Sequence, residues 1–400
     1  MKLTISNVKE ACMRILHTAD WHIGQRLHER QRIDEHKEFL NWLLNTIQEQ
    51  KVDLLLVSGD IFDTALPSAE ATNLYYSFLF RLFNETDAYT VIIAGNHDSP
   101  RHLDAPKEFL KMGRIHVVGL THDPAECVVE IPPDNPQIAI AAVPYLSENE
   151  LPHVSFESDI KKQERYRERL KSFYHDCVSN MPENIPKILM GHLFVQGGSV
   201  GDSERNIQIG GATAIEANDF PDNVDYVALG HLHRPQSIKG KEYPIQYAGS
   251  PIPLRFNEAS YEKKAFLLEF SEDNNLIRND EINIPIFKEL ITLEGDENHI
   301  LSQAMLGNWD GKYIQVKLKL DSVRTGVADE IRKVFSDRGG DVLTVELQMQ
   351  NEGERPNIDV EDMKQPEELF DQFYQTEFGQ PPDNMLKQTF SELMEMVEDR

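Results

Sequence analysis

The chain has 400 residues, which is enough for two or three domains with hydrophobic cores. Its 40% hydrophobic and 27% charged residues are ordinary for a soluble globular protein, and no apolar stretch approaches the ~18 residues that a membrane span needs. A formal net charge of −27 argues against a protein that binds DNA over its whole surface, because phosphate binding needs clustered Lys and Arg. Bound metal ions or a partner protein would have to supply the positive charge.

The N-terminal segment and the cysteines indicate where the protein works. Residues 1–12 predict an optional extension, with neither the long apolar core nor the small-residue cleavage site of a secretory signal. The cysteines, Cys12, Cys127 and Cys177, are far apart in the sequence and form no CxxC pair. This usage favours a reducing cytoplasm over a disulfide framework or a cysteine zinc site.

From residue 13 onwards, apolar β-type runs alternate with helical patterns. The runs expected to form strands are RILHTADWHIG (14–24), VDLLLVSGD (52–60), YTVIIAGNHD (89–98), IAIAAVPY (138–145), IPKILMGHLF (185–194), VDYVALGHLH (224–233) and IQYAGSP (245–251). Residues 39–47 and 69–83 keep apolar side chains at helical spacing between these runs. Continuous apolar strands are covered on both faces, so the alternation predicts an α/β layered domain over residues 13–285.

Near residue 286 the pattern changes. YIQVKLKL (313–320) alternates apolar and polar residues as a half-exposed strand does, a helical stretch follows, and VLTVELQM (342–349) predicts another strand. These elements predict a small α+β domain over residues 286–350. A polar linker over 351–365 and helices over 366–400 complete the expected organisation.

Five of the strands expected in the α/β domain end in Asp, Asn or His. In chain order the side chains are Asp20 and His22, Asp60 and Asp63, Asn96 to Asp98, His192, and His231 with His233. The carboxyl ends of strands in open α/β sheets open onto the ligand crevice, so these side chains are expected to converge. Glycines before most of them let the backbone turn sharply and approach a small ligand closely.

The converging residue types suit a binuclear metal centre, because carboxylate, amide oxygen and neutral imidazole bind Mn²⁺, Fe or Zn²⁺. The expected ligands are Asp20, His22 and His233 for one ion, Asn96, His192 and His231 for the other, and Asp60 as a bridge. Two ions ~3.5–4 Å apart would polarise a phosphodiester and lower the pKa of a bridging water.

One histidine of the set has no assigned metal. His97 is expected to donate a proton or hydrogen bond to the phosphate or the leaving oxygen, with Asp98 holding its ring. His17 is expected to be buried in a strand. The remaining histidines are expected on the surface: His28, His36, His102, His116, His122, His153, His175 and His299.

Each of these elements also has a simpler interpretation. A lone Asp-x-His is usually a chance pair in a loop, Asp60 suits a helix N-cap, and Asn96 to Asp98 suits a turn. The metal hypothesis therefore depends on the ordered set of five strand ends, and not on any single one.

The ordered set DxH, GDxxD, GNHD, GH and GHxH resembles the calcineurin-like metallophosphoesterase superfamily. A closer resemblance, to the family of SbcD nuclease subunits, rests on TADWHIG (18–24), SGDIFDT (58–64), AGNHDSP (94–100), ALGHLHRPQ (228–236) and YAGSPIPLRFNE (247–258). It implies a layered β-sandwich flanked by helices and a small α+β capping domain. It also implies two Mn²⁺ ions on the ligands named above and His97 as the transition-state histidine. Archaeal and eukaryotic relatives have a second catalytic histidine where this chain has Asp63, so no catalytic role is implied for Asp63.

The resemblance also implies an activity and a partner. The activity is a Mn²⁺-dependent DNA exonuclease and endonuclease that cleaves phosphodiesters at double-strand ends and hairpins, in DNA repair and recombination. The partner is an SbcC-like SMC-family ATPase, bound by a homodimer of this subunit within an ATP-dependent heterotetramer. Because the chain is acidic, we expect it to bind DNA weakly alone and the ATPase to supply most phosphate contacts.

Two segments are candidates for contacting these partners. KKQERYRERLK (161–171) is a possible basic DNA-binding patch, although a solvated helix with compensating glutamates explains it at least as well. The last helix has an apolar stripe on an otherwise acidic surface, at Leu386, Phe390, Leu393 and Val397. Such a stripe suits a groove of the ATPase partner or the protein's own surface.

Two other functions remain open on the sequence alone. A cyclic-nucleotide phosphodiesterase or phosphatase would use the same metals, but phosphatases of this superfamily often carry Arg after GDxxD, where this chain has Thr64. A purely structural subunit would use its metals only to stabilise a scaffold. Such a scaffold has no need of an unligated histidine such as His97.

Overall fold

The structure is a computed structural model that describes residues 11–151, 162–199, 215–320 and 326–349, with Arg324 and short pieces between residues 370 and 390. The chain divides into two compact units, Met1–Gln348 and Met349–Arg400. Within the described ranges, no helix is both long and apolar enough to cross a membrane.

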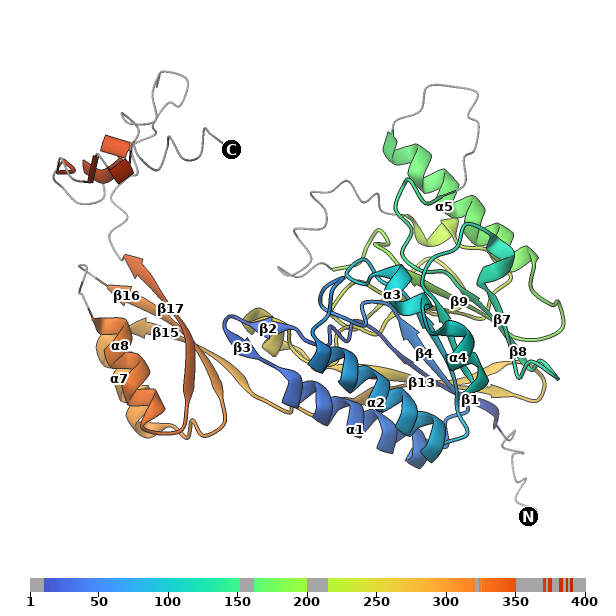
Figure 1. Ribbon diagram of the computed structural model, residues 1–400, viewed down its shortest axis with the longest axis horizontal. Helices are drawn as coiled ribbons and strands as arrows, with labels where there is room; N and C mark the ends of the chain where they lie inside the picture. Colours follow the sequence, from blue (N-terminus) through green and yellow to red (C-terminus); the bar gives the residue numbers. More distant parts are fainter. Residues whose placement is uncertain are drawn as a thin grey trace, which may run out of the picture. The chain divides into compact units, whose positions relative to one another are not determined.

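Two six-stranded sheets form the centre of the first unit (Figure 1). The first sheet has the order β14-β13-β1-β4-β5-β6, with β1 Ala11–Thr18, β4 Leu54–Ser58, β5 Tyr89–Ile93, β6 Ile115–Val118, β13 Lys264–Ser271 and β14 Leu276–Asn283. The second has the order β11-β12-β10-β9-β8-β7, with β7 Val128–Ile131, β8 Ile138–Ala142, β9 Lys187–His192, β10 Tyr226–Gly230, β11 Gln236–Ile238 and β12 Ile245–Tyr247. Neighbouring strands from β1 to β6 and from β8 to β12 run parallel, so their carboxyl ends lie at one edge of each sheet.

The alternation of side chains along each central strand explains why the sheets stack. In β4, Leu54 and Leu56 point into a core shared with strands of the second sheet, while Leu55 and Val57 point to the opposite face. All four side chains are buried, which is the pattern of a strand covered on both sides.

Helices cover the outer face of each sheet (Figure 1). The helices α1, Ile33–Gln50, and α2, Ala69–Glu85, pack on the first sheet, and α5, Lys162–Ser179, packs on the second. Ser68 begins α2, because its side chain accepts a hydrogen bond from the Ala71 amide. The predicted α/β layered fold with a β-sandwich flanked by helices is therefore confirmed.

Short elements fill the connections. They are β2 Arg26–Leu27, β3 Arg30–Gln31, α3 Pro100–Asp104, α4 Lys107–Met112 and the 3-10 turns η1 Pro124–Cys127, η2 Ala217–Asp219 and η3 Phe256–Ser260. The first strand begins at Ala11, two residues before residue 13, where the sequence predicts the α/β domain to start. Ala11 pairs with Ser271 across a bulge, which extends β1 into the segment expected to be an extension.

The chain leaves the sandwich after β14 and builds a smaller three-stranded sheet. Its elements are β15 Leu290–Asp296, α7 Glu297–Leu306, β16 Tyr313–Leu320, α8 Val327–Ser336 and β17 Asp341–Met349, with strand order β15-β16-β17. Ile314, Val316 and Leu318 alternate along β16 and pack with apolar residues of α7 and α8. The helices therefore cover one face of this sheet.

In the second unit, short helical pieces are described between residues 370 and 390. The rings of Phe370 and Phe390 stack with centroids 4.3 Å apart, and Lys387 pairs with Asp371. The two pieces thus contact each other through part of the predicted apolar stripe. The expected linker and the stripe residues Leu393 and Val397 lie outside the described residues.

Candidate metal centre

All seven expected metal ligands follow the carboxyl ends of five strands. Asp20 and His22 follow β1, Asp60 follows β4, Asn96 follows β5, His192 ends β9, and His231 and His233 follow β10. In the second sheet Gly230 pairs directly with His192, which places the last two loops side by side.

Asp60 lies at the centre of the cluster. Its Oδ2 atom is 3.3 Å from His192 Nε2 and 3.5 Å from His22 Nε2. Asp60 is shared by two groups whose ligand atoms are close enough to hold an ion, one with Asp20 and His192 and one with His22 and His97. A carboxylate in this position is suited to bridge two cations.

Asn96 joins the histidines of the second sheet. Its Oδ1 atom is 3.0 Å from His192 Nε2 and 3.1 Å from His231 Nδ1. On the other side, the rings of His22 and His233 lie with centroids 5.0 Å apart. The structure thus gathers the seven expected ligands around Asp60, although it groups Asp20 with His192 and not with His22, so the division into two trios stays a prediction.

Two features of the cluster fit a bound cation. The buried Asp20 Oδ2 and His22 Nε2 atoms have no hydrogen-bond partner, although burying an unpaired polar atom costs about 1–3 kcal/mol. His192 Nδ1 donates its proton to the Ser58 carbonyl at 2.9 Å, so in the neutral ring the Nε2 lone pair would face oxygens of Asp60 and Asn96. Electron-rich atoms facing one another in this way are stabilised by a cation between them.

The pKa values of the buried groups show how the site balances its charge without an ion. Burial raises the pKa of Asp20 to about 7. Burial would also raise the pKa of Asp60, but His192 and His22 hold it well below its usual range. Burial alone would lower the pKa of His192, but the Asp60 charge raises it to about 9. Metal ligands must be deprotonated, so an ion would displace a proton from His192.

The backbone at the ligands is unusual. Asp20, His22, Asp60 and His231 have φ angles of 52°, 47°, 51° and 102°, in the left-handed region that non-glycine residues rarely adopt. Strained backbone of this kind is typical of functional sites held by the surrounding structure.

Two glycines before the ligands are needed because neighbouring atoms approach their backbone closely, and not because of a positive φ angle. A Cβ atom on Gly230 would lie 1.8 Å from the Ser58 carbonyl oxygen, and one on Gly95 would lie 2.1 Å from Asp60 Oδ1. Gly59 differs, because its φ of 85° also requires glycine. The glycines therefore let neighbouring strand ends pack tightly enough to bring the ligands together.

Groups behind the ligands orient the histidine rings. His233 Nδ1 lies 3.2 Å from Glu258 Oε1, and His22 Nδ1 lies 3.4 Å from Asp63 Oδ1. The contacts of His192 with the Ser58 carbonyl and of His233 with Glu258 leave Nε2 of these two rings directed at the site. His22 Nδ1 makes no hydrogen bond with Asp63, so the contact between them is electrostatic. Sequence reasoning missed Ser58 and Glu258, and the GDxxD motif was the only signal for Asp63.

His97 lies at the accessible side of the cluster. Its half-buried ring donates from Nδ1 to the Asp63 carbonyl at 2.8 Å, so Nε2 is available to a substrate. Its amide donates to Asp60 Oδ1 at 2.9 Å, and its ring centroid is 4.8 Å from that of His22. His97 is therefore close enough to the cluster either to act on a bound phosphate or to serve as a further ligand.

Asp98 has a different role from the one expected. Its Oδ2 atom accepts hydrogen bonds from the amides of Gly95 and Ile61, at 2.8 and 3.0 Å, and Oδ1 accepts from Phe62 at 2.9 Å. Both carboxylate oxygens are thus used by backbone donors, and the His97 ring is held by the Asp63 carbonyl instead. Asp98 supports the loops after β4 and β5.

One histidine expected on the surface is buried beside the site. His36 lies within α1, and its Nε2 atom is 3.0 Å from the carbonyl oxygen of Trp21, between Asp20 and His22. The His36 side chain therefore contacts the loop after β1, which carries Asp20 and His22. The prediction that His17 is buried is confirmed, since its ring lies between Tyr226 and Ser58.

The basic run 161–171 is largely occupied by structural contacts. Arg167 pairs with Asp219 at 2.7 Å, Lys171 lies 3.8 Å from the same carboxylate, and buried Arg169 donates to the Leu151 carbonyl. These contacts favour the interpretation of the run as a structural helix. Lys161 lies outside the described residues.

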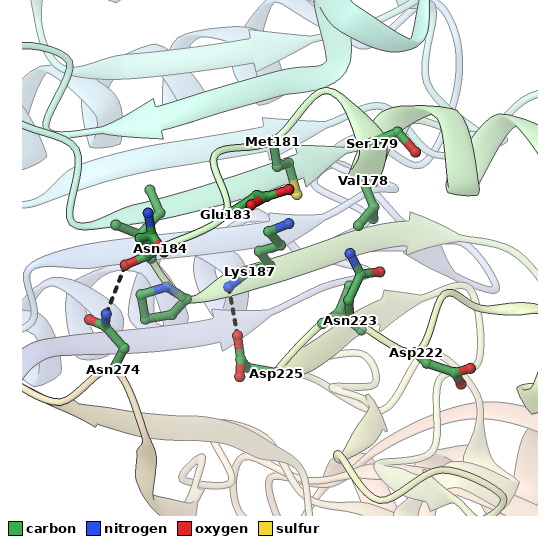
Figure 2. A pocket seen from close by; sticks show the side chains of 13 residues that line it. Val178, Ser179, Met181, Glu183, Asn184, Lys187, Asp222, Asn223, Asp225 and Asn274 are labelled. Carbon is green, nitrogen blue, oxygen red and sulfur yellow. Dashed lines mark hydrogen bonds between the residues drawn. The ribbon is translucent and has the colours of Figure 1, made fainter.

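A large cavity, of about 840 Å³, lies at the other end of the strands (Figure 2). Its wall includes Lys187, the first residue of β9, and Asp225, just before β10, whose carboxylate accepts from the Lys187 amide at 2.7 Å. The Asn274 amide donates to the Asn184 carbonyl across its rim. None of the seven ligands lines this cavity, so it is separate from the metal centre at the carboxyl ends of the strands.

Comparison with known proteins agrees with this geometry. The profile of the calcineurin-like phosphoesterase family matches residues 13–235. The SbcD subunit of the SbcCD nuclease of Bacillus subtilis is 30% identical over 393 residues, which span 97% of this chain and 99% of that protein. The SbcD subunit of Escherichia coli K12 is 35% identical over 73% of each chain, and that of Rhodobacter capsulatus is 36% identical over 65% of this chain and 67% of its own.

Proposed function

This chain belongs to the SbcD family of calcineurin-like metal-dependent phosphodiester hydrolases, and we propose on that basis that it is a Mn²⁺-dependent DNA exonuclease and endonuclease. Its substrates would be double-strand ends and hairpins, in DNA repair and recombination. The observation that carries the proposal is the position of Asp60, whose Oδ2 atom faces imidazole nitrogens of both trios.

The proposed ligands keep the roles expected from the sequence. They are Asp20, His22 and His233 for one Mn²⁺ ion, Asn96, His192 and His231 for the second, and Asp60 for both. The pair of ions would supply Lewis acidity and lower the pKa of a nucleophilic water. The protein contributes the orientation of the rings and buried walls that exclude bulk water.

His97 supplies the remaining step. Because Nδ1 donates to the Asp63 carbonyl, Nε2 is the atom that would donate a proton or hydrogen bond to the phosphate or the leaving oxygen. Asp98 contributes indirectly, by fixing the loop that carries His97 and Asn96.

A nuclease assay tests the function. With Mn²⁺ we expect cleavage of linear duplex and hairpin DNA, slower cleavage of end-blocked duplex, and a large rise when the SbcC-like ATPase and ATP are added. Excess EDTA should abolish all cleavage, because every proposed step needs the ions.

The matched substrate is bis-p-nitrophenyl phosphate. Hydrolysis of this compound without any cleavage of DNA, even with the ATPase present, would favour the alternative of a small-molecule phosphodiesterase or phosphatase. If DNA cleavage and hydrolysis of bis-p-nitrophenyl phosphate both survived chelation, the metal mechanism would be excluded.

Two observations support a partner protein that makes most of the contacts with DNA phosphates. The chain carries a net charge of −27, and Arg167 and Lys171 of the basic run are paired with carboxylates. We place the contact with the ATPase on the C-terminal unit, where Phe373 and Leu386 remain exposed.

A second copy of this chain is the proposed occupant of an apolar patch on α2 and α4. Phe80 and Phe83 lie one turn apart on α2, and Phe109 and Met112 one turn apart on α4. Phe80, Phe109 and Met112 are 68%, 75% and 82% exposed. A Cβ at the end of α4, on Gly113, would lie 3.3 Å from the Phe83 ring, so the two helices are neighbours.

The two helices that carry this patch hold both signs of charge, which suits a self-complementary interface. Arg81 and Glu85 pair with each other on α2, at 2.9 Å, and Lys107, Glu108 and Lys111 lie on α4. Away from a two-fold axis through the patch, a residue lies opposite a different one in the second copy, so that basic and acidic side chains can pair across it.

Replacing Phe109 by glutamate is expected to convert a dimer into a monomer, because a charge would be buried at the interface. Sedimentation equilibrium of the purified protein measures the change, and hydrolysis of bis-p-nitrophenyl phosphate per chain should be retained. Leu306→Glu, at an 83% exposed position on α7, is the control and should leave the mass unchanged. A wild-type monomer at all concentrations would rule out this use of the patch.

We also propose a cytoplasmic location. Cys127 and Cys177 are far apart in the sequence but share one apolar cluster, where both are buried free thiols. A disulfide is common for neighbouring cysteines in oxidising compartments, so unpaired thiols here fit a reducing one.

A further inference from the structure

Glu258 and Lys263 form a buried ion pair directly behind His233. Their side chains are only 1% and 5% exposed, and Lys263 Nζ lies 2.7 Å from Glu258 Oε2. A buried pair of charges contributes little to stability, because removing both ions from water costs several kcal/mol per ion. Its position next to a proposed metal ligand suggests a role in the site.

The two oxygens of Glu258 face different groups. Oε2 accepts from Lys263 Nζ and from the Leu254 amide at 3.1 Å, with Ser250 Oγ at 3.3 Å. Oε1 lies 3.2 Å from His233 Nδ1. Because Oε2 is held from several directions, the carboxylate cannot turn away from the ring.

Lys263 holds the backbone of the same ligand. Its Nζ atom lies 3.4 Å from the His233 carbonyl oxygen and 2.7 Å from Ser250 Oγ. The Ser250 amide donates to that carbonyl as well, at 3.1 Å. The ring and the main chain of His233 are therefore fixed by one connected group of three side chains.

We propose that Glu258 is a positioning residue for the metal site. Its carboxylate holds His233 in the tautomer with the proton on Nδ1, which leaves Nε2 free to bind the ion that we propose His233 would share with Asp20 and His22. Lys263 balances the charge of Glu258 and keeps its carboxylate in place. The inference rests on the proposed metal site and adds to it a residue that lies 25 positions from His233 and touches no substrate.

Glu258→Gln tests the proposal through metal binding itself. An amide keeps the size of the side chain but loses the charge that favours the Nδ1–H tautomer. We expect the affinity for one of two Mn²⁺ ions to fall about 10- to 100-fold, with the other changing by less than about threefold. Calorimetric titration and the electron paramagnetic resonance signal of coupled Mn²⁺ pairs measure this without any assay of activity.

Glu262→Gln is the matched control, because Glu262 is exposed and lies one residue before Lys263. It should bind both ions as the wild type does. If the wild type bound no Mn²⁺, the proposed function would fail. If the wild type and Glu258→Gln both bound two ions equally well, only the positioning role would fail.

A double variant separates positioning from stability. Glu258→Gln leaves Lys263 buried without its carboxylate, which lowers the urea midpoint of the metal-free protein. Adding Lys263→Met removes that charge, so the midpoint should recover towards that of the wild type while weak binding of one ion remains. Recovery of Mn²⁺ affinity together with the midpoint would show that the effect was merely structural and would overturn the proposal.

Discussion

Replacing His97 by glutamine is expected to lower kcat for phosphodiester cleavage by about 10²- to 10⁴-fold while two Mn²⁺ ions remain bound. The expectation follows from the ring position, since Nδ1 is committed to the Asp63 carbonyl and Nε2 is left for the substrate. Steady-state cleavage of linear duplex DNA gives the rate, and elemental analysis after dialysis gives the metal content. The substitution keeps the amide that donates to Asp60 Oδ1.

The metal count decides between two roles for His97. The structure places His97 with His22 and Asp60 in a group that could hold an ion. Loss of one ion together with activity would make His97 a ligand and contradict its role as a proton donor. Full activity with both ions bound would remove His97 from the mechanism. His175→Gln, at an exposed position on α5, should leave both measurements unchanged.

Gly230→Ala is expected to damage both the fold and the metal site. A Cβ atom there would lie 1.8 Å from the Ser58 carbonyl oxygen, which is backbone and cannot move aside as a flexible side chain does. Overpacking of this kind costs about 1–3 kcal/mol or more, and the strain falls next to His231. We expect a lower urea midpoint in the presence of EDTA and loss of at least one Mn²⁺ ion from the folded protein.

Gly295→Ala is a suitable comparison. Its Cβ would lie 2.7 Å from the ring of His299, which is an exposed side chain and can turn towards solvent. The urea midpoint should therefore change little. An equal effect of both substitutions would mean that the close approach of β10 to β4 is not what requires Gly230.

The fold was predictable because its central strands are buried on both faces. In β4 every residue from Leu54 to Ser58 is buried, and such a run gives a strong signal from the sequence alone. The convergence of Asp60 and Asn96 was predictable for the same reason, since β4 and β5 are parallel neighbours that end at one edge. His192 comes from the second sheet, and its approach to them depends on how the two sheets stack. The start of β1 was missed, because the bulge near Ala11 depends on its pairing with Ser271, a residue from the far end of the sandwich sequence.

The groups that orient the ligands were not predictable in this way. The Ser58 carbonyl and Glu258 act on His192 and His233 through contacts between distant segments, and neither has a fixed spacing from its histidine. Asp98 was expected to hold the ring of its sequence neighbour His97, but both of its carboxylate oxygens accept hydrogen bonds from three backbone amides. Competition among donors for one carboxylate is decided by packing, which the order of residues does not reveal.

The left-handed backbone at four ligands means that substitutions which stabilise the protein there can reduce its activity. At His22 and His231 a left-handed conformation costs roughly 1–2 kcal/mol relative to a right-handed one, and glycine would remove most of that penalty. Glycine at either position would relieve the backbone but leave the space of a buried ring empty and remove a proposed ligand, so a gain in stability there would come with a loss of metal binding. Engineering of this protein for higher stability should keep both histidines and change other positions.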